Sequence, residues 1–195
     1  STAAKKYKIA ISLPAADHGW IAGAKWWAEK IAKEHEGEAE IKIQTSADPA
    51  AQTSDIETML LSKPDAMVVL ATESAPLTPI AKKIKEQGCL LVNVDRGFLE
   101  PVADLFLSGD NKAFGTKAAE YIGKKLGTGN IVILEGVPCT VNTDRVTAFN
   151  EEIKKYPGIK VLDSQPGKWN QEEAFKVTET MLLKYPKIED RKSVV

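Results

Sequence analysis

Cysteine and histidine are scarce in this sequence, with two of each among its 195 residues. Cys89 and Cys139 lie far apart, and neither has a metal-ligand spacing to the other or to His18 or His35. We therefore expect no metal site and two unpaired thiols. A disulfide stays open as an alternative in an oxidising compartment.

Long hydrophobic runs and an excess of positive charge are also missing. No segment approaches the roughly 20 apolar residues that a membrane-spanning helix needs. The 26 Lys and Arg residues are balanced by 27 Asp and Glu residues, which argues against a nucleic-acid partner. The first residues, Ser-Thr-Ala-Ala-Lys-Lys, lack the apolar centre of a signal peptide. We expect either a cytoplasmic protein or a mature exported protein whose signal has been removed.

The sequence does contain short apolar runs that alternate with amphipathic stretches. The runs predict strands of a parallel sheet, and the 3.6-residue spacing between them predicts helices. Right-handed crossovers make such a string a doubly wound open sheet. The predicted strands are 7–13, 40–44, 66–71, 90–94, 105–108, 130–134 and 160–163, and the predicted helices are 21–35, one beginning at 48–49, 79–87, 111–126, 143–156 and 171–185.

The pattern begins again near residues 104–110, which predicts two domains and a hinge between them. Residues 1–106 form the N-terminal lobe and residues 107–195 a partial C-terminal lobe. The charged stretch 189–192 follows the last helix, and a strand buried on both faces would not tolerate it. The predicted fold class is therefore α/β, with two doubly wound parallel-sheet lobes of which the second is incomplete.

Ligands of open α/β sheets bind beyond the carboxyl ends of the strands. The loops at these ends contain carboxylates, an amide, a guanidinium group and indoles, a mixture that suits a neutral polyhydroxylated ligand. Sugar hydroxyls donate to a carboxylate and accept from a guanidinium group, so the neighbours Asp95 and Arg96 can hold a pair of them. An indole face packs on sugar C–H groups. Glu73 is better explained as a helix cap, and no residue is expected to be catalytic.

Four segments, taken in order along the chain, resemble the ribose-binding branch of the periplasmic sugar-binding proteins. These are type I substrate-binding proteins of ABC transporters, and the resemblance covers essentially residues 5–188. The segments are Asp17-His18-Gly19-Trp20, Val94-Asp95-Arg96, Ser108-Gly109-Asp110-Asn111, and Ser164-Gln165-Pro166 followed by Trp169.

The resemblance implies a non-enzymatic protein that binds a small sugar in a cleft between its lobes and delivers it to a membrane ABC transporter permease. It implies a periplasmic or extracytoplasmic location and no cofactor. Trp20 and Trp169 would sandwich the sugar ring, and the polar contacts would come from Asp17, Asp95, Arg96 and either Asn142 or Thr143. Members of the family continue past Pro186 and cross back to the first lobe, so we expect this chain to be C-terminally truncated.

Three alternatives stay open. A truncated form could bind little sugar and act through a partner or as a homo-oligomer, joined through the unfinished second lobe. A sugar-responsive regulator shares the two-lobe core, but it needs a helix-turn-helix segment and only six residues precede Tyr7. A nucleotide-binding enzyme needs a glycine-rich phosphate loop after the first strand, and residues 13–17 contain none. The identity of the sugar is not readable from the sequence.

Overall fold

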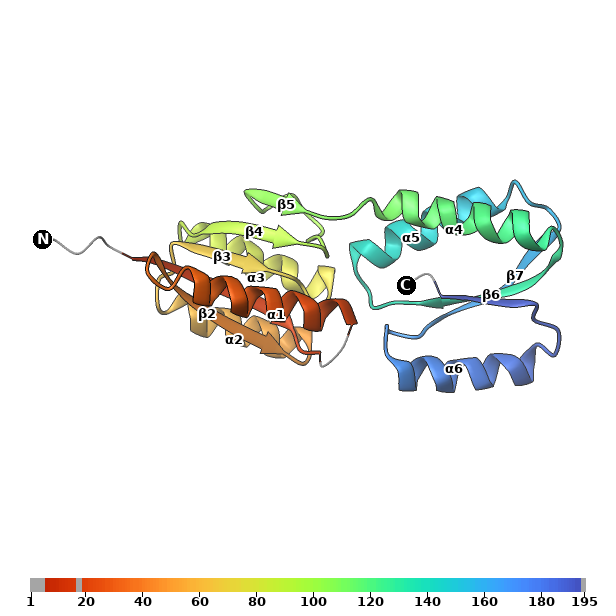
Figure 1. Cartoon of the computed structure of the whole chain (residues 1–195), viewed down its shortest axis with the longest axis horizontal. Coiled ribbons are helices and arrows are strands. Elements are labelled where there is room, and N and C mark those ends of the chain that lie inside the picture. The colour runs from red at the N-terminus through yellow and green to blue at the C-terminus, as the bar shows by residue number, and fades with distance from the viewer. Residues whose placement is uncertain (1–5, 17–18, 194–195) are drawn as a thin grey trace, which may run out of the picture. The chain divides into compact units, whose positions relative to one another are not determined.

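The computed structural model describes residues 6–16 and 19–193, with the backbone alone at residues 190–193. The chain divides into two compact units, Ser1–Ser108 and Gly109–Val195 (Figure 1). Each unit is a parallel sheet with helices on its faces, which confirms the predicted α/β class. No helix in the described part of the chain is both long and apolar enough to cross a membrane.

The first unit contains a five-stranded parallel sheet in the order β2-β1-β3-β4-β5. Its two longest strands, β1 and β2, pair from Tyr7 with Ala39 to Pro14 with Ser46. The strands alternate with three helices along the chain, as the spacing of the apolar runs predicts. The elements are β1 (Tyr7–Pro14), α1 (Gly19–Glu34), β2 (Ala39–Ser46), α2 (Pro49–Leu60), β3 (Ala66–Val69), α3 (Ser74–Glu86), β4 (Leu90–Val94) and β5 (Leu105–Leu107).

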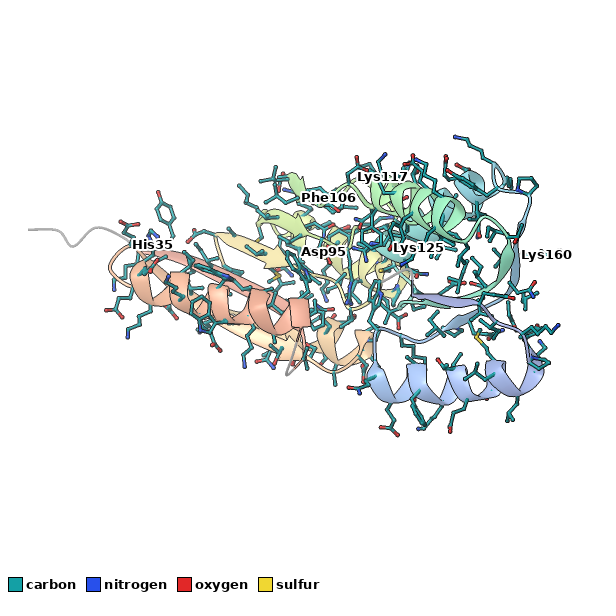
Figure 2. The ribbon with its side chains drawn as sticks, turned by 45° about the vertical axis from the view of Figure 1, so that its right-hand side comes forward. His35, Asp95, Phe106, Lys117, Lys125 and Lys160 are labelled. Atoms are coloured by element: carbon teal, nitrogen blue, oxygen red, sulfur yellow. The ribbon has the colours of Figure 1, made fainter. Side chains whose placement is uncertain are left out.

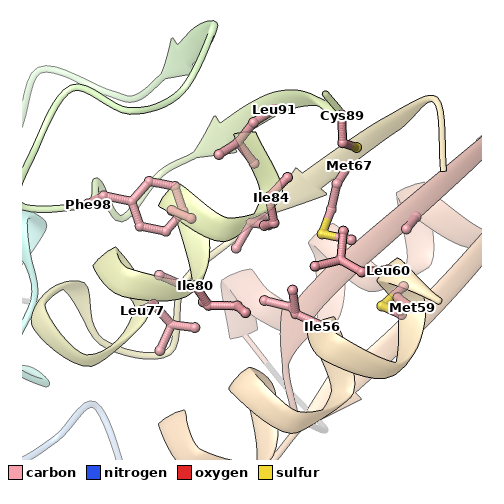
Figure 3. Packing of buried hydrophobic residues seen from close by; sticks show 14 residues of the cluster. Ile56, Met59, Leu60, Met67, Leu77, Ile80, Ile84, Cys89, Leu91 and Phe98 are labelled. Carbon is pink, nitrogen blue, oxygen red and sulfur yellow. The ribbon is translucent and has the colours of Figure 1, made fainter. Parts of the chain in front are cut away.

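The core of the first unit lies between its sheet and the helices α2 and α3 (Figure 3). Ile56, Met59 and Leu60 follow one another at helical spacing, so α2 turns them together onto Met67 and Leu91 of the sheet. The other face of the sheet is covered by α1 (Figure 1), which has no buried residue. The two faces of this sheet are therefore packed unequally.

The second unit has a three-stranded parallel sheet in the order β7-β6-β8. Four consecutive residues of β6, Ile131 to Leu134, are buried because helices pack on both faces of this central strand. Helices α4 and α5 cover one face of this sheet and α6 covers the other (Figure 1). Ile131 and Ile133 pack with residues of α4 and α5, whereas Val132 and Leu134 pack with residues of α6. The elements are α4 (Asn111–Leu126), β6 (Gly129–Glu135), α5 (Thr140–Ile153), β7 (Ile159–Pro166), α6 (Gln171–Lys184) and β8 (Asp190–Ser193).

The strand β8 corrects the prediction that residues 189–192 do not form one. Its backbone pairs in parallel with β6, from Ile131 with Asp190 to Leu134 with Ser193. Glu189 prepares this pairing, because its backbone N–H donates to the carbonyl of Asn130 and its carboxylate accepts from the backbone N–H of Asn130. The prediction considered only a strand buried on both faces, but β8 is an edge strand, which backbone hydrogen bonds to one neighbour hold in place.

Helix α3 begins five residues before the predicted start at Pro79. Pro76 and Pro79 are the third and sixth residues of α3. Pro76 lies where the amide groups have no partner within the helix, whereas Pro79 removes one backbone hydrogen bond inside the helix, which continues to Glu86. The hydroxyl of Thr78 donates to the carbonyl of Ser74 at 2.8 Å in this first part of α3. Proline was therefore an unreliable marker of the helix boundary here.

Candidate ligand site

The sheet topology selects one end of each unit. In the first sheet β1 lies between β2 and β3, and in the second sheet β6 lies between β7 and β8. The chain leaves such neighbouring strands in opposite directions, which opens a crevice at their carboxyl ends. The loops that border these ends follow β1, β3 and β4 in the first unit and β6 and β7 in the second.

In the first unit a buried glutamine of α2 holds the carboxyl ends of β1 and β3 together. Gln52 Nε2 donates to Ser12 Oγ at 3.0 Å and to the carbonyl of Leu70 at 2.9 Å. Its Oε1 accepts from the backbone N–H of Thr72 at 2.7 Å. Gln52 is fully buried, so these bonds satisfy polar groups that water cannot reach. Gln52 of α2 thus fixes the backbone of the loop after β3.

Arg96 is buried beside the same loop. Its Nη1 donates to the carbonyl of Thr72 at 2.8 Å and to that of Ala71 at 3.3 Å. Asn93 in turn donates from Nδ2 to the carbonyls of Val69 and Arg96 and accepts at Oδ1 from the backbone N–H of Phe98. The guanidinium group predicted to hold sugar hydroxyls therefore also ties the end of β4 to the end of β3.

The other predicted residues of the first unit are more exposed. Asp95 directly follows β4, is half-buried, and has a backbone φ of 63°, a left-handed conformation that is uncommon for residues other than glycine (Figure 2). Trp20, predicted in a loop, is instead the second residue of α1 and is 70% exposed. Asp17 lies outside the described residues. His35 follows α1 at the end of the unit away from Asp95 and contacts Glu38 (Figure 2).

Residues of α1 and α3 near the candidate loops have local contacts. Trp27 of α1 is 55% exposed and packs at a steep angle on Trp26, with the two ring centres 4.8 Å apart. The ammonium group of Lys30 lies over both indoles. Glu73 stands at the N-cap of α3, as predicted, although its side chain makes no capping hydrogen bond. These residues have local structural explanations.

The second unit has a cavity of about 200 Å³ at the carboxyl end of its central strand. One wall is the indole of Trp169, which is half-buried in the turn between β7 and α6. Its lining combines this aromatic face with a carboxylate and two amides, and the lining residues are Leu134, Glu135, Gly167, Trp169, Asn170, Gln171 and Ala174. An indole beside polar groups is the combination that the sequence predicted for a sugar.

Glu135 ends β6 and connects three elements around this cavity. Its carboxylate accepts from Asn142 Nδ2 of α5 at 3.1 Å and from the hydroxyl of Ser164 of β7. Asn142 Oδ1 accepts from the backbone N–H of Gly136 at 2.8 Å. The predicted site residue Asn142 is therefore buried in a local network, and Thr143, its alternative, is exposed.

Arg145 has a local role as well. Its Nε donates to Asn111 Oδ1 at 2.9 Å, and its guanidinium carbon lies 4.4 Å from the centre of the Phe114 ring. Both contacts tie α5 to the start of α4. Among the described residues, no group of three or more His, Cys, Asp and Glu side chains could hold a metal ion.

Comparison with known proteins decides the family. A family model described as a periplasmic binding protein domain matches residues 9–189. The chain belongs to the periplasmic binding protein family. This confirms the resemblance seen in the sequence, and it agrees with the prediction of a binding protein rather than an enzyme.

Curated relatives of this binding protein include a D-ribose/D-allose-binding protein of Pseudomonas aeruginosa, 29% identical over 192 residues, and a ribose import binding protein of Bacillus subtilis, 26% identical over 187 residues. The chain spans about 60% of the length of both, and they cover 93% and 95% of the chain. Among solved structures, a fructose-binding periplasmic domain of a hybrid two-component system is similar, with a TM-score of 0.89 and 27% identity. That match covers 96% of this chain and 63% of the other.

Sequence reasoning missed the polar residues closest to Trp169. Glu135 directly follows the predicted strand 130–134, but it was not among the predicted site residues. A signal was present, because Glu135 is the first charged residue after the buried run from Ile131 to Leu134. Asn170 and Gln171 follow Trp169 directly, and as N-cap and first residue of α6 they line the same cavity.

Proposed function

We propose that this periplasmic binding protein binds a small sugar, a monosaccharide or a similar polyol, with groups at the carboxyl ends of its sheets. The observation that carries the proposal is the cavity of about 200 Å³ in the second unit, where the Trp169 indole stands beside Glu135, Asn170 and Gln171. A sugar ring has an apolar C–H face and a polar edge. This lining offers a partner to each.

The energies are sufficient for reversible binding. An indole face that covers a sugar ring contributes about 2 kcal/mol from the apolar area removed from water. A hydrogen bond to a charged group contributes about 1.5–3 kcal/mol. One stacked ring and a few such bonds reach roughly millimolar to micromolar affinity once the cost of ordering the ligand is subtracted. No covalent step is needed for this function.

The relatives support the ligand class. Proteins similar to this chain are named for ribose, allose and xylitol, and the similar structure at 27% identity is named for fructose. These ligands are pentoses, hexoses or a related polyol. They differ in ring form and in the orientation of their hydroxyls, so the proposal commits to the class of small sugars.

The first unit would contribute through the residues predicted from the sequence, Asp17, Trp20, Asp95 and Arg96. Thr143 remains a candidate of the second unit because its side chain is exposed. A hinge near residues 104–110 would let both sets contact one ligand. We further propose an extracytoplasmic location and delivery of the sugar to a membrane ABC transporter permease. Self-association through the edges of the second sheet stays a prediction.

The test is calorimetric titration of the 195-residue chain with D-ribose, D-allose, D-fructose and D-arabinose, and with ATP as a nucleotide control. We expect saturable binding of at least one sugar and none of ATP. Trp169→Ala should weaken that binding at least tenfold, because the stacking face is lost. Trp26→Ala, which removes another exposed indole, is the matched control and should leave the affinity unchanged. Equal affinity of Trp169→Ala and the unmodified chain would refute the indole contact, and no binding of any sugar would refute the proposal.

A further inference from the structure

The indole of Trp169 lies directly against the backbone of Gly136. A Cβ atom added at Gly136 would stand 2.1 Å from Cε2 and 2.3 Å from Cζ2 of this indole. Carbon atoms in contact are ordinarily about 3.5–4.0 Å apart. Gly136 does not have a positive φ, so the position requires glycine for space and not for backbone freedom. The absence of a side chain here is what lets the indole lie where it does.

The turn that carries Trp169 is held in an unusual conformation. Lys168 and Trp169 are consecutive residues with φ values of 57° and 52°, a left-handed region that side-chain-bearing residues rarely occupy. The carbonyl of Glu135 accepts from the backbone N–H groups of Gly167 at 2.8 Å and Lys168 at 3.0 Å. Conformations of this kind persist where the surroundings fix them, and they concentrate at ligand-binding positions.

The backbone of Gly136 is fixed on its other side by the network of Glu135. The Gly136 N–H donates to Asn142 Oδ1, and Asn142 Nδ2 donates to the Glu135 carboxylate. The same carboxylate accepts from the Ser164 hydroxyl at the end of β7. Glu135 thus holds both segments that position the indole. Its carboxylate holds Gly136 through Asn142, and its backbone carbonyl holds the turn that carries Trp169.

We propose that Gly136 is a positioning residue that sets the place of the Trp169 indole and, through it, the affinity of the second-unit cavity for a sugar ring. This inference rests on the proposed function for its ligand. Alanine at this position would force the indole to move by about 1 Å or more, because the Trp169 ring and the added Cβ cannot share the space. A shift of that size changes the room available to a stacked ring.

The experiment combines a double-mutant cycle with a direct view of the indole. Gly136→Ala, Trp169→Phe and the double variant are titrated with the sugar that the unmodified chain binds best. The indole N–H resonance of Trp169 is assigned in ¹H–¹⁵N spectra by its absence from Trp169→Phe. We expect Gly136→Ala to shift this resonance and leave those of the other three tryptophans in place, and to weaken sugar binding at least tenfold. The smaller phenyl ring of Trp169→Phe should tolerate the added methyl group. The double variant should therefore bind the sugar less than threefold more weakly than Trp169→Phe alone.

Gly23→Ala serves as the matched control, because a Cβ at Gly23 would meet nothing within 4 Å. A Gly136→Ala variant with unchanged sugar affinity, or with equal losses in both backgrounds of the cycle, would overturn the positioning role. Failure of the unmodified chain to bind any sugar is a different result, which overturns the proposed function and the ligand role built on it. The Trp169 resonance still reports in that case whether Gly136 sets the place of the indole.

Discussion

The carboxyl ends of the two sheets carry polar side chains that serve different purposes. In the first unit Gln52, Asn93 and Arg96 are buried, and they donate mostly to backbone carbonyls of the neighbouring loops. In the second unit the half-buried Glu135 lines an open cavity beside the Trp169 indole. The same place in the topology thus holds buried, hydrogen-bonded side chains in one unit and borders an open cavity in the other. A place at the carboxyl end of a strand makes a residue a candidate for the site. Its contacts then show whether it supports the loops or lines a cavity.

The hydrophobic cores of the two units also differ in how the faces of their sheets are packed. In the second unit the central strand β6 is buried on both faces, between a cluster with α4 and α5 and one with α6. In the first unit the described core cluster lies on the side of α2 and α3, and α1 buries none of its residues. The buried amides of the first unit therefore lie on its densely packed side, where losing a hydrogen bond is most expensive.

The largest expected effect follows from removing the amide that joins the strand ends of the first unit. Gln52→Ala would leave Ser12 Oγ, the Leu70 carbonyl and the Thr72 N–H without their partner and would open a cavity. We expect the free energy of unfolding to fall by about 3 kcal/mol or more. Hydrogen exchange should speed up in peptides of the first unit and stay unchanged in those of the second.

Gln44→Ala is the control for Gln52→Ala, because Gln44 is exposed and its contacts are long, at 3.4 Å. It should change the free energy of unfolding by no more than about 0.5 kcal/mol. If Gln52→Ala were equally harmless, the polar cluster of the first unit would have no structural purpose, and the contrast between the units would disappear.

The next effect concerns Arg96, whose two roles can be separated. Arg96→Met keeps much of the side-chain volume but leaves the carbonyls of Ala71 and Thr72 without their buried donor. We expect a loss of about 2 kcal/mol in the free energy of unfolding, measured by urea denaturation without sugar. Unchanged stability together with lost sugar binding would instead assign Arg96 to the ligand alone. In that case polar residues at the strand ends of both units would serve the ligand, and the contrast between the units would be lost.

Much of this architecture could be predicted because hydrophobic periodicity reports burial directly. The runs at residues 66–71 and 130–134 predicted strands of a parallel sheet, and Trp169 was correctly placed in the turn after β7. The edge strand β8 was missed because an edge is held by backbone groups, which leave no apolar signature. Trp20 was placed in the loop before the predicted helix 21–35, whereas α1 begins at Gly19. The Gly136–Trp169 contact was beyond sequence reasoning, since it depends on a distance between residues of different turns.

The smallest effect tests whether the units differ in their response to acid. The hydrogen bond from Gln165, with further ones from Lys184, Ser164 N–H and Tyr185, lowers the pKa of Asp163 in β7 to about 2. A lowered pKa means that the ionised form stabilises the fold above the unfolded value of about 3.9, and that this contribution is lost as the pH falls towards 2.

Asp163→Asn should therefore lower the free energy of unfolding by about 1 kcal/mol or less at pH 7, and the difference from the unmodified chain should shrink below pH 4. The side-chain amide of Gln52 does not titrate in this range, so the penalty of Gln52→Ala should be the same at pH 7 and pH 4. Urea denaturation of both variants at pH 7, 4 and 3 makes the comparison. An Asp163→Asn penalty as large at pH 3 as at pH 7 would mean that hydrogen-bond geometry, and not the charge of the carboxylate, stabilises this part of the second unit. In that case acid would not distinguish the two units.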